Sequence, residues 1–161
     1  MDRVFSIKGF GTVVTGTLVD GKIETGESVE IYPLEKLARV RELQNHDVRQ
    51  ERVSAGMRVA INLGGVEKKE LMRGCTIAKP YSMQLTYRIA ASIQLTKDSP
   101  YSVKNASLVH FYQGTQELVG RVRLLSCNVL KPGQKGYALI MFEEKLTARN
   151  LDKFIIRFFS P

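Results

Sequence analysis

The glycines near the amino end of the chain are the first residues whose spacing could support chemistry. Gly9, Gly11 and Gly16 follow a short apolar segment, and glycines at a strand-to-helix turn can bind phosphate through backbone amides. The residues after Gly11 are the strand formers Thr12-Val13-Val14-Thr15, and no Lys-Ser or Lys-Thr pair follows them. We therefore expect a strand, a tight turn and a second strand, with no phosphate loop.

Hydrolysis would need a nucleophile beside a base, or paired carboxylates in a cleft. The two histidines, His46 and His110, lie in different halves of the chain, and Glu143-Glu144 is typical of a solvated turn. Cys75 and Cys127 have no CxxC partner and no histidine cluster, which favours two reduced structural thiols over a zinc site or a disulfide. We expect neither a catalytic residue nor a metal ion in this chain.

Arginines on one strand are a better candidate for chemistry. Arg121 and Arg123 flank Val122, so the two-residue period of a strand puts both guanidinium groups on one face, where they could bind phosphates. Lys104, Lys131, Lys135, Arg149 and Arg157 lie in the same half, with Tyr101, Tyr112 and Tyr137 as possible stacking partners. The alternative for any one of these cations is a solvated surface charge.

Composition restricts the class of protein. The chain has 161 residues, and 43% of them are hydrophobic, which is enough apolar content for globular cores. Its net charge of +8 is a surplus of positive charge that favours a polyanionic partner. Residues 1–80 contain 13 Lys and Arg against 11 Asp and Glu (+2), whereas residues 81–161 contain 11 against 5 (+6). No apolar run is long enough for a membrane span and no secretory signal precedes the first strand. We interpret residue 1 as a boundary within a longer cytoplasmic protein.

The positions of the turns indicate an all-β protein. Turn residues interrupt short β-branched runs every eight to twelve residues, which is typical of sandwiches or barrels. We expect a hairpin at Asp20-Gly21 between the strands at 12–18 and 27–32, and a helix of about two turns only at 67–73. Lys79-Pro80-Tyr81-Ser82 is the predicted linker, so the predicted domains are 1–80 and 81–161. The remaining predicted strands lie at 38–43, 57–63, 76–78, 84–95, 107–112, 117–125, 136–142 and 152–159.

These motifs resemble the second and third domains of the elongation-factor-Tu-like translational GTPases, both β-barrels. Residues 2–16 resemble the opening of the second domain, and the segments at 40–46, 55–63 and 73–74 resemble its later strands and turns. Residues 150–161 resemble the end of the third domain. Asp2-Arg-Val-Phe5 and Ala55-Gly-Met-Arg-Val-Ala60 are similar to the selenocysteine-specific elongation factor, whereas elongation factor Tu has an acidic residue in place of Arg3 and an uncharged amide in place of Arg58.

The resemblance implies a role for these residues. Asp2, Arg3 and Arg58 match the aminoacyl pocket, where Asp2 would orient an arginine and the cations would favour an anionic selenol over the neutral hydroxyl of serine. An alternative role for Arg3 and Arg58 is docking against a GTPase domain. Strand parity groups Arg3 with the core-like Phe5 and Ile7 and puts Arg58 out of phase with its apolar neighbours, so the two could meet only near a barrel rim.

Gln44 lies where relatives of elongation factor Tu have a glutamate that contacts the terminal adenosine of the tRNA. The third-domain barrel would bind the T stem, with Arg121, Arg123, Arg149 and Arg157 as candidates for contacts to the RNA backbone.

The implied parent protein binds GTP and magnesium, delivers selenocysteyl-tRNA to the ribosome at UGA codons, and reads an mRNA hairpin with a C-terminal extension. This fragment would lack the GTPase domain, hydrolyse nothing, bind no cofactor and be a monomer with no membrane contact. Two alternatives remain open. One is the barrels of another translational GTPase, of the elongation factor Tu or initiation factor 2 gamma type, and the other is a free-standing barrel that binds nucleic acid or protein.

Overall fold

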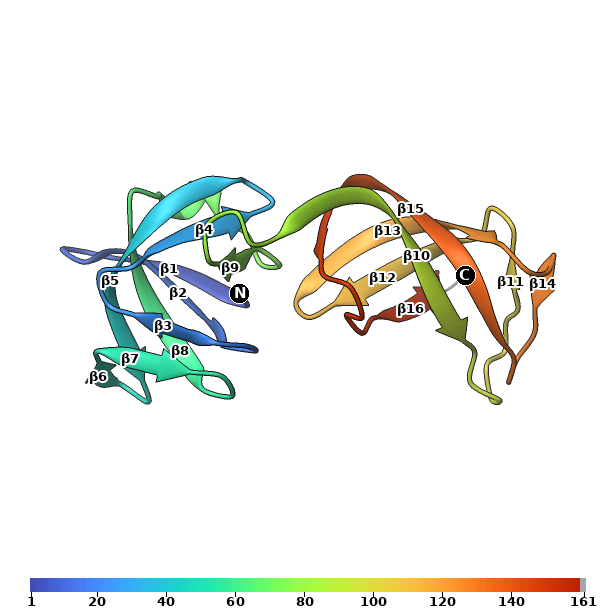
Figure 1. Cartoon of the computed structure of the whole chain (residues 1–161), viewed down its shortest axis with the longest axis horizontal. Helices are drawn as coiled ribbons and strands as arrows, with labels where there is room; N and C mark the ends of the chain where they lie inside the picture. The colour runs from blue at the N-terminus through green and yellow to red at the C-terminus, as the bar shows by residue number, and fades with distance from the viewer. Residues whose placement is uncertain (160–161) are drawn as a thin grey trace. The chain divides into compact units, whose positions relative to one another are not determined.

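The protein consists of two compact units, which divide between Gln84 and Leu85 (Figure 1). The computed structural model describes residues 1–159, so the end of the predicted third-domain segment, residues 160 and 161, lies outside the described residues. Each unit is built almost entirely from strands. The predicted fold class, two consecutive all-β barrels, is confirmed.

The first unit contains one large antiparallel sheet and one short ribbon. The sheet has the strand order β1-β2-β8-β5-β4-β9, with β6 paired to β5, and the ribbon pairs β3 with β7. The bounds are β1 Arg3–Ile7, β2 Gly11–Thr17, β3 Lys22–Glu24, β4 Ser28–Tyr32, β5 Lys36–Asn45, β6 Val48–Gln50, β7 Arg52–Ser54, β8 Arg58–Gly64 and β9 Thr76–Ala78.

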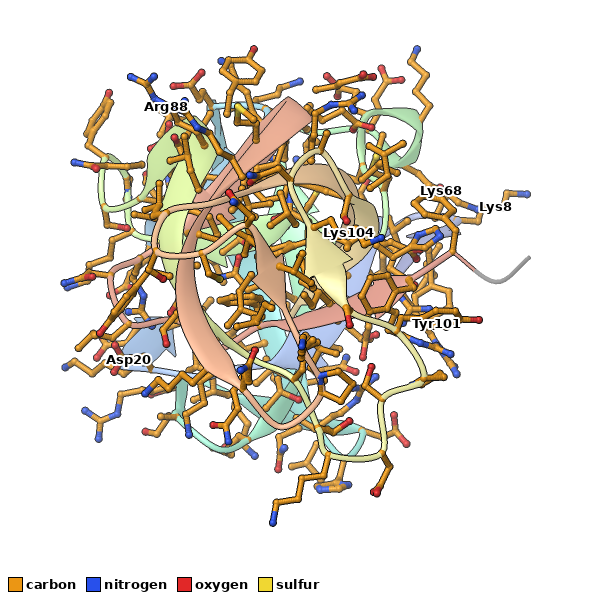
Figure 2. All side chains as sticks on the ribbon, turned by 90° about the vertical axis from the view of Figure 1, so that its right-hand side faces the viewer. Lys8, Asp20, Lys68, Arg88, Tyr101 and Lys104 are labelled. Atoms are coloured by element: carbon orange, nitrogen blue, oxygen red, sulfur yellow. The ribbon has the colours of Figure 1, made fainter. Side chains whose placement is uncertain are left out.

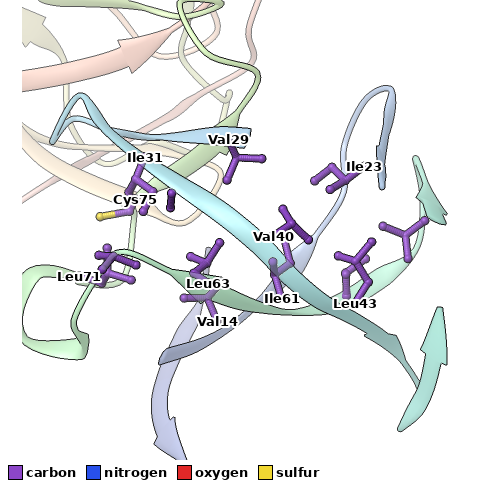
Figure 3. Close-up of a cluster of buried hydrophobic side chains, with 14 residues drawn as sticks. Val14, Ile23, Val29, Ile31, Val40, Leu43, Ile61, Leu63, Leu71 and Cys75 are labelled. Carbon is purple, nitrogen blue, oxygen red and sulfur yellow. The ribbon is translucent and has the colours of Figure 1, made fainter. Parts of the chain in front are cut away.

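The inner faces of these strands supply the first core (Figure 3). Successive side chains of a strand point to opposite faces, so Val14 of β2, Val40 of β5 and Leu63 of β8 are almost fully buried while their neighbours face outward. The cluster also includes Ile23 and Val53 of the ribbon, which closes over one side of the large sheet.

The second unit is a five-stranded antiparallel sheet, β10-β15-β13-β12-β16, with a two-stranded ribbon of β11 and β14. Its core centres on Phe111, whose ring meets Phe142 and Phe154 at centroid distances of 4.9 Å. The bounds are β10 Gln84–Gln94, β11 Val103–Lys104, β12 Leu108–Gln113, β13 Gln116–Leu124, β14 Val129–Leu130, β15 Lys135–Ala148 and β16 Ile155–Phe158.

Two local predictions are wrong. The hairpin at Asp20-Gly21 does not form, because β2 pairs with β1 and β8 while the next strand, β3, pairs with β7. The predicted helix at 67–73 is a single 3-10 turn, η1, at Lys68–Glu70. Only Leu71 in that segment is buried, so no apolar stripe supports a second turn.

The cysteines differ in their surroundings. Both are free thiols, but Cys75 packs in the first core, as expected of a structural thiol, whereas Cys127 is exposed, so the prediction of a structural role is wrong for it.

Candidate functional site

The outer face of the β1-β2-β8-β5 sheet brings together the residues predicted for the aminoacyl pocket. Arg3 of β1 pairs with Thr15 of β2, Thr15 pairs with Ala60 of β8, and Ala60 pairs with Gln44 of β5. Residues that pair directly across an antiparallel sheet share a face. Arg58 lies two residues before Ala60 and therefore shares this face as well.

The parity argument made from the sequence is wrong for β1. Val4 packs against the core, whereas Phe5 is 40% and Ile7 is 47% exposed. Arg3 therefore faces outward with Phe5 and Ile7, in phase with Arg58. Two strand spacings of about 4.8 Å and two residues of about 3.3 Å rise put the Cα atoms of Arg3 and Arg58 about 12 Å apart.

Asp2 connects Arg58 to the middle strand of this face. Its Oδ2 accepts a hydrogen bond from Nη1 of Arg58 at 2.5 Å, and its Oδ1 accepts one from the hydroxyl of Thr15 at 2.9 Å. Burial acts to raise the pKa of the Asp2 carboxyl, but the hydrogen bonds from Arg58 and Thr15 outweigh it and hold that pKa below its usual value. The carboxylate therefore remains ionised and fixes the direction of the Arg58 guanidinium.

Arg3 differs from Arg58 because no hydrogen bond or ion pair joins its guanidinium to another residue in the described part of the chain. Its side chain is exposed. The site thus combines one arginine held by a carboxylate with a second whose donors face solvent, and its three charged groups sum to one net positive charge. An anionic group of a ligand is the natural partner of such a site.

Gln44 has an acidic neighbour that the sequence reasoning missed. Its Nε2 donates to Oε1 of Glu42 at 2.8 Å, and Glu42 forms an ion pair with Arg49 of β6. The hydrogen bond from Arg49 holds the pKa of the Glu42 carboxyl below its usual value. A carboxylate therefore lies two residues before Gln44 on the same strand face, already paired with Arg49.

Exposed apolar side chains form a second feature of this face that the sequence did not reveal. Arg3, Thr15, Ala60 and Gln44 lie in line across the four strands and are called the Arg3 row. In the next outward-facing row, Phe5 pairs with Val13, Val13 with Asn62, and Asn62 with Glu42. An alternating apolar strand is normally assigned to a core, so Phe5 and Ile7 gave no signal of exposure. An apolar surface beside cations and amides suits a ligand with a ring system and polar edges.

In the second unit, three of the four candidate arginines share the outer face of one sheet. Arg121 and Arg123 are exposed on either side of the buried Val122, as expected from the strand period. Arg157 of β16 pairs with His110 of β12, which pairs with Val119 of β13, so Arg157 lies on the same face. Its Cα is about 12 Å from that of Arg121 by strand spacing and rise.

Arg149 lies apart from these three. It follows β15 in a turn where its backbone amide donates to Asp152 Oδ2 at 2.8 Å, and its Nε is 4.0 Å from Asp152 Oδ1. Gln113, at the end of β12, also donates to Asp152. Arg149 thus lies at the far end of the β12-β13 hairpin with a carboxylate beside it, which weakens its attraction for another anion.

The three tyrosines considered as stacking partners, Tyr101, Tyr112 and Tyr137, do not form one stacking surface. Tyr112 pairs with Glu117 at one end of β13. The carbonyl of Tyr137 accepts a hydrogen bond from the amide of Leu125, just beyond the other end. Glu117 and Leu125 are about 26 Å apart along the chain. Tyr101 lines a shallow hollow of about 460 Å³ with Lys104, Leu108 and Phe158. Figure 2 shows Tyr101 and Lys104 at the surface of this unit.

Neither a metal site nor a membrane-spanning helix is present in the part of the chain that the structure describes. Residues 1–159 contain no group of three or more His, Cys, Asp or Glu side chains arranged to hold a metal ion. Over the same range, no helix has the length and apolar character needed to cross a membrane.

Comparison with known proteins identifies both barrels. Residues 11–78 match the family model of elongation factor Tu domain 2, and residues 88–160 match that of the selenocysteine-specific elongation factor beta-barrel domain. The selenocysteine-specific elongation factor of Desulfomicrobium baculatum is 37% identical over the whole chain, and that of Escherichia coli is 29% identical over 98% of it. This chain spans about a quarter of the length of each, 25% and 24%.

Solved structures agree with this assignment. The crystal structure of a bacterial selenocysteine-specific elongation factor has a TM-score of 0.80 at 30% identity, covering 96% of this chain and 24% of that one. Translation elongation factor SelB from Methanococcus maripaludis has a TM-score of 0.81 at 26% identity, covering 96% and 37%. Elongation factor 1-alpha of Pyrobaculum aerophilum, by contrast, matches only 48% of the chain. The chain belongs to the elongation-factor-Tu-like family of selenocysteine-specific elongation factors and comprises its second- and third-domain barrels.

Proposed function

We propose that this chain is the RNA-holding part of a factor that binds selenocysteyl-tRNA and delivers it to the ribosome at UGA codons in a GTP-dependent manner. The first barrel would hold the aminoacylated acceptor end on its outer face, and the second would bind the T stem. The observation that carries the proposal is the shared face of Arg3, Asp2, Arg58 and Gln44. The protein would act as a cytoplasmic monomer.

The chemistry of selenocysteine matches this face. A selenol is largely an anion at neutral pH, whereas the serine from which selenocysteyl-tRNA is made carries a neutral hydroxyl. A hydrogen bond to a charged group contributes about 1.5 to 3 kcal/mol, and about 1.4 kcal/mol is tenfold in affinity. Arg3 and Arg58 together could therefore separate the two aminoacyl groups by at least one order of magnitude.

GTP and magnesium would belong to another domain. Gly9 and Gly11 connect β1 to β2 by a tight turn with positive φ angles of 84° and 89°. This is a strand-to-strand connection, which does not present a helix amino terminus to a phosphate. This turn thus does not fit a nucleotide phosphate, and the GTPase domain of the parent protein would bind both groups.

A free-standing base-stacking module is the alternative of a different class. Such a module would group its exposed aromatic side chains along one groove. Tyr112 of β12 and Tyr137 of β15 instead lie beside opposite ends of β13. The exposed Phe5 and Ile7 lie on the face that carries Arg3 and Arg58. The arrangement favours recognition of one RNA end over sequence-independent stacking.

The test is to replace Arg58 by Ala in the full-length protein that contains this chain and to measure binding of selenocysteyl-tRNA and seryl-tRNA. We expect the preference for selenocysteyl-tRNA to fall about tenfold or more. Arg52→Ala is the matched control, because Arg52 also lies near a carboxylate, 3.8 Å from Glu24, but belongs to the separate β3-β7 ribbon. An unchanged preference would remove Arg58 from the mechanism, and equal weakening of both tRNAs would favour docking of the GTPase domain.

A further inference from the structure

Two glycines lie side by side on the outer face of the first barrel. Thr12 of β2 pairs with Leu63 of β8, and the next position along the ladder brings Gly11 opposite Gly64. Leu63 points into the core (Figure 3), so Gly64 belongs to the opposite, outer face. The sheet therefore has a strip without side chains at this point.

The side chain of Arg41 occupies this strip. Arg41 is the extra residue of a β-bulge on β5, where the register with β8 shifts between Val40 and Glu42. A Cβ atom added to Gly64 would lie 2.6 Å from Nε of Arg41 and 3.2 Å from its Cζ, and one added to Gly11 would lie 3.7 Å from Nη1. Gly64 is buried although it faces outward, since Arg41 covers it.

This guanidinium is fixed by packing rather than by a counter-ion. Arg49 and Arg58, on neighbouring strands, form ion pairs with Glu42 and Asp2. Among residues 1–159, no hydrogen bond or ion pair joins the guanidinium of Arg41 to another residue. An arginine held in place with its donors unused suits the planar, bidentate binding of a phosphate group.

The position of Arg41 relative to the acceptor-end face indicates which phosphate it would bind. Gly64 lies four residues along β8 from Ala60, about 13 Å from the Arg3 row. The exposed Phe5 lies between the two positions, in line with Val13 and Asn62. The side chain of Asn62 donates a hydrogen bond to the carbonyl of Phe10 at 2.9 Å. An aminoacyl group beside Arg3 and Arg58 would leave the preceding nucleotides extended along this face toward Arg41.

We propose that Arg41, seated on Gly11 and Gly64, binds a phosphodiester group of the single-stranded 3′ end of the tRNA. This inference rests on the proposed function of the face and adds a contact to the RNA backbone, distinct from recognition of the amino acid. Arg41 should therefore strengthen binding of selenocysteyl-tRNA and seryl-tRNA by the same factor.

The test uses the full-length protein and selenocysteyl-tRNA in which a neutral methylphosphonate replaces one terminal phosphodiester at a time. We expect Arg41→Gln to weaken binding of unmodified tRNA about tenfold. At one linkage, the methylphosphonate should weaken binding by the wild type by a similar factor while leaving Arg41→Gln unchanged. Gly64→Ala keeps the charge but displaces the guanidinium, and it should remove the same sensitivity.

The control is Arg73→Gln, which removes the same charge from an exposed arginine outside the sheet. This variant should remain as sensitive as the wild type to the methylphosphonate. Equal sensitivity of the wild type and Arg41→Gln at every linkage would overturn the inference while leaving the proposed function intact. Failure of the wild type to bind unmodified selenocysteyl-tRNA would overturn the proposed function itself.

Discussion

Asp2 and Arg58 form an ion pair on the outer face of the first barrel, with Oδ2 of Asp2 2.5 Å from Nη1 of Arg58. Their backbones lie on either side of β2, whose Thr15 hydroxyl also donates to Asp2. A carboxylate thus already neutralises one of the two arginines that would recognise a selenol. The Asp2 carboxylate could strengthen recognition of the selenol by fixing the direction of the Arg58 guanidinium. It could also weaken recognition by cancelling the positive charge of Arg58.

Replacing Asp2 by Asn separates these effects. If orientation dominates, Asp2→Asn should lower the preference for selenocysteyl-tRNA over seryl-tRNA by up to about tenfold, the value of one charge-assisted hydrogen bond. Thr15→Val, which keeps the ion pair and removes only the second hydrogen bond, should have a smaller effect. Tighter binding of selenocysteyl-tRNA by Asp2→Asn would show that charge, and not orientation, is the role of Asp2. Equilibrium binding with both tRNAs provides the measurement.

The same ion pair predicts a pH dependence of stability. The pKa of Asp2 lies below its usual value of 3.8 in the folded protein, so the unfolded chain binds the proton more tightly. The contribution of Asp2 to stability is therefore fully present above about pH 4 and is lost as the pH falls through the lowered pKa. We expect the wild type to be more stable than Asp2→Asn at pH 7, with the difference shrinking below pH 4 in urea unfolding curves. A difference that does not change with pH would contradict the pKa assignment.

The sequence predicted correctly which side chains face outward on strands with one charged and one apolar face. The prediction was wrong for a strand that is apolar on both faces. Strand β13 alternates charged and apolar residues, so both its existence and the outward direction of Arg121 and Arg123 followed from the pattern. Strand β1 carries apolar side chains on both faces, and there parity alone put Phe5 in the core and Val4 outside it. Only the pairing of β1 with β2 resolves this choice.

Contacts between distant segments account for the other errors. The pairing of β3 with β7 joins residues that are some thirty positions apart, so the turn at Asp20-Gly21 resembled a local hairpin. The bulge at Arg41 has no local sequence signature, and the contact of its guanidinium with Gly11 and Gly64 depends on three strands. Sequence periodicity specifies which residues share a face but not which strands lie beside them.

A buried glutamate holds the linker that follows the first barrel. Oε2 of Glu30 accepts hydrogen bonds from the hydroxyl of Tyr32 at 2.5 Å and from the amide of Tyr81 at 2.6 Å. Tyr81 has a φ angle of 61° in the turn at 79–82, a conformation that costs a non-glycine residue about 1 to 2 kcal/mol. The carboxylate thus offsets the unfavourable backbone of Tyr81.

Glu30→Gln should therefore destabilise the first barrel by about 1 to 3 kcal/mol, because the amide cannot accept both hydrogen bonds as strongly. Amide exchange at Tyr81 should become faster, which reports on the linker directly. The control is Glu51→Gln, a substitution of the same shape at an exposed position, for which we expect a change within about 0.5 kcal/mol. Unchanged exchange at Tyr81 in Glu30→Gln would mean that the carboxylate does not hold the turn.

The two barrels should contribute to RNA binding in ways that salt can distinguish. Arg121 and Arg123 lie on an exposed strand face with no ion pair to another described residue, so their binding to phosphates would be electrostatic and independent of the aminoacyl group. Replacing both by Gln should weaken selenocysteyl-tRNA and seryl-tRNA equally. The slope of log affinity against log salt should fall by about one for each phosphate that the variant no longer neutralises.

Arg149→Gln should change the slope less, since Asp152 already lies beside that guanidinium. Arg58→Ala should alter the preference between the two tRNAs while leaving the slope nearly unchanged, because it acts on the aminoacyl group. A slope that is unaffected by removing Arg121 and Arg123 would mean that this face of the second barrel does not touch the RNA backbone. The +6 charge of residues 81–161 would then act only as a long-range field that speeds encounter with tRNA.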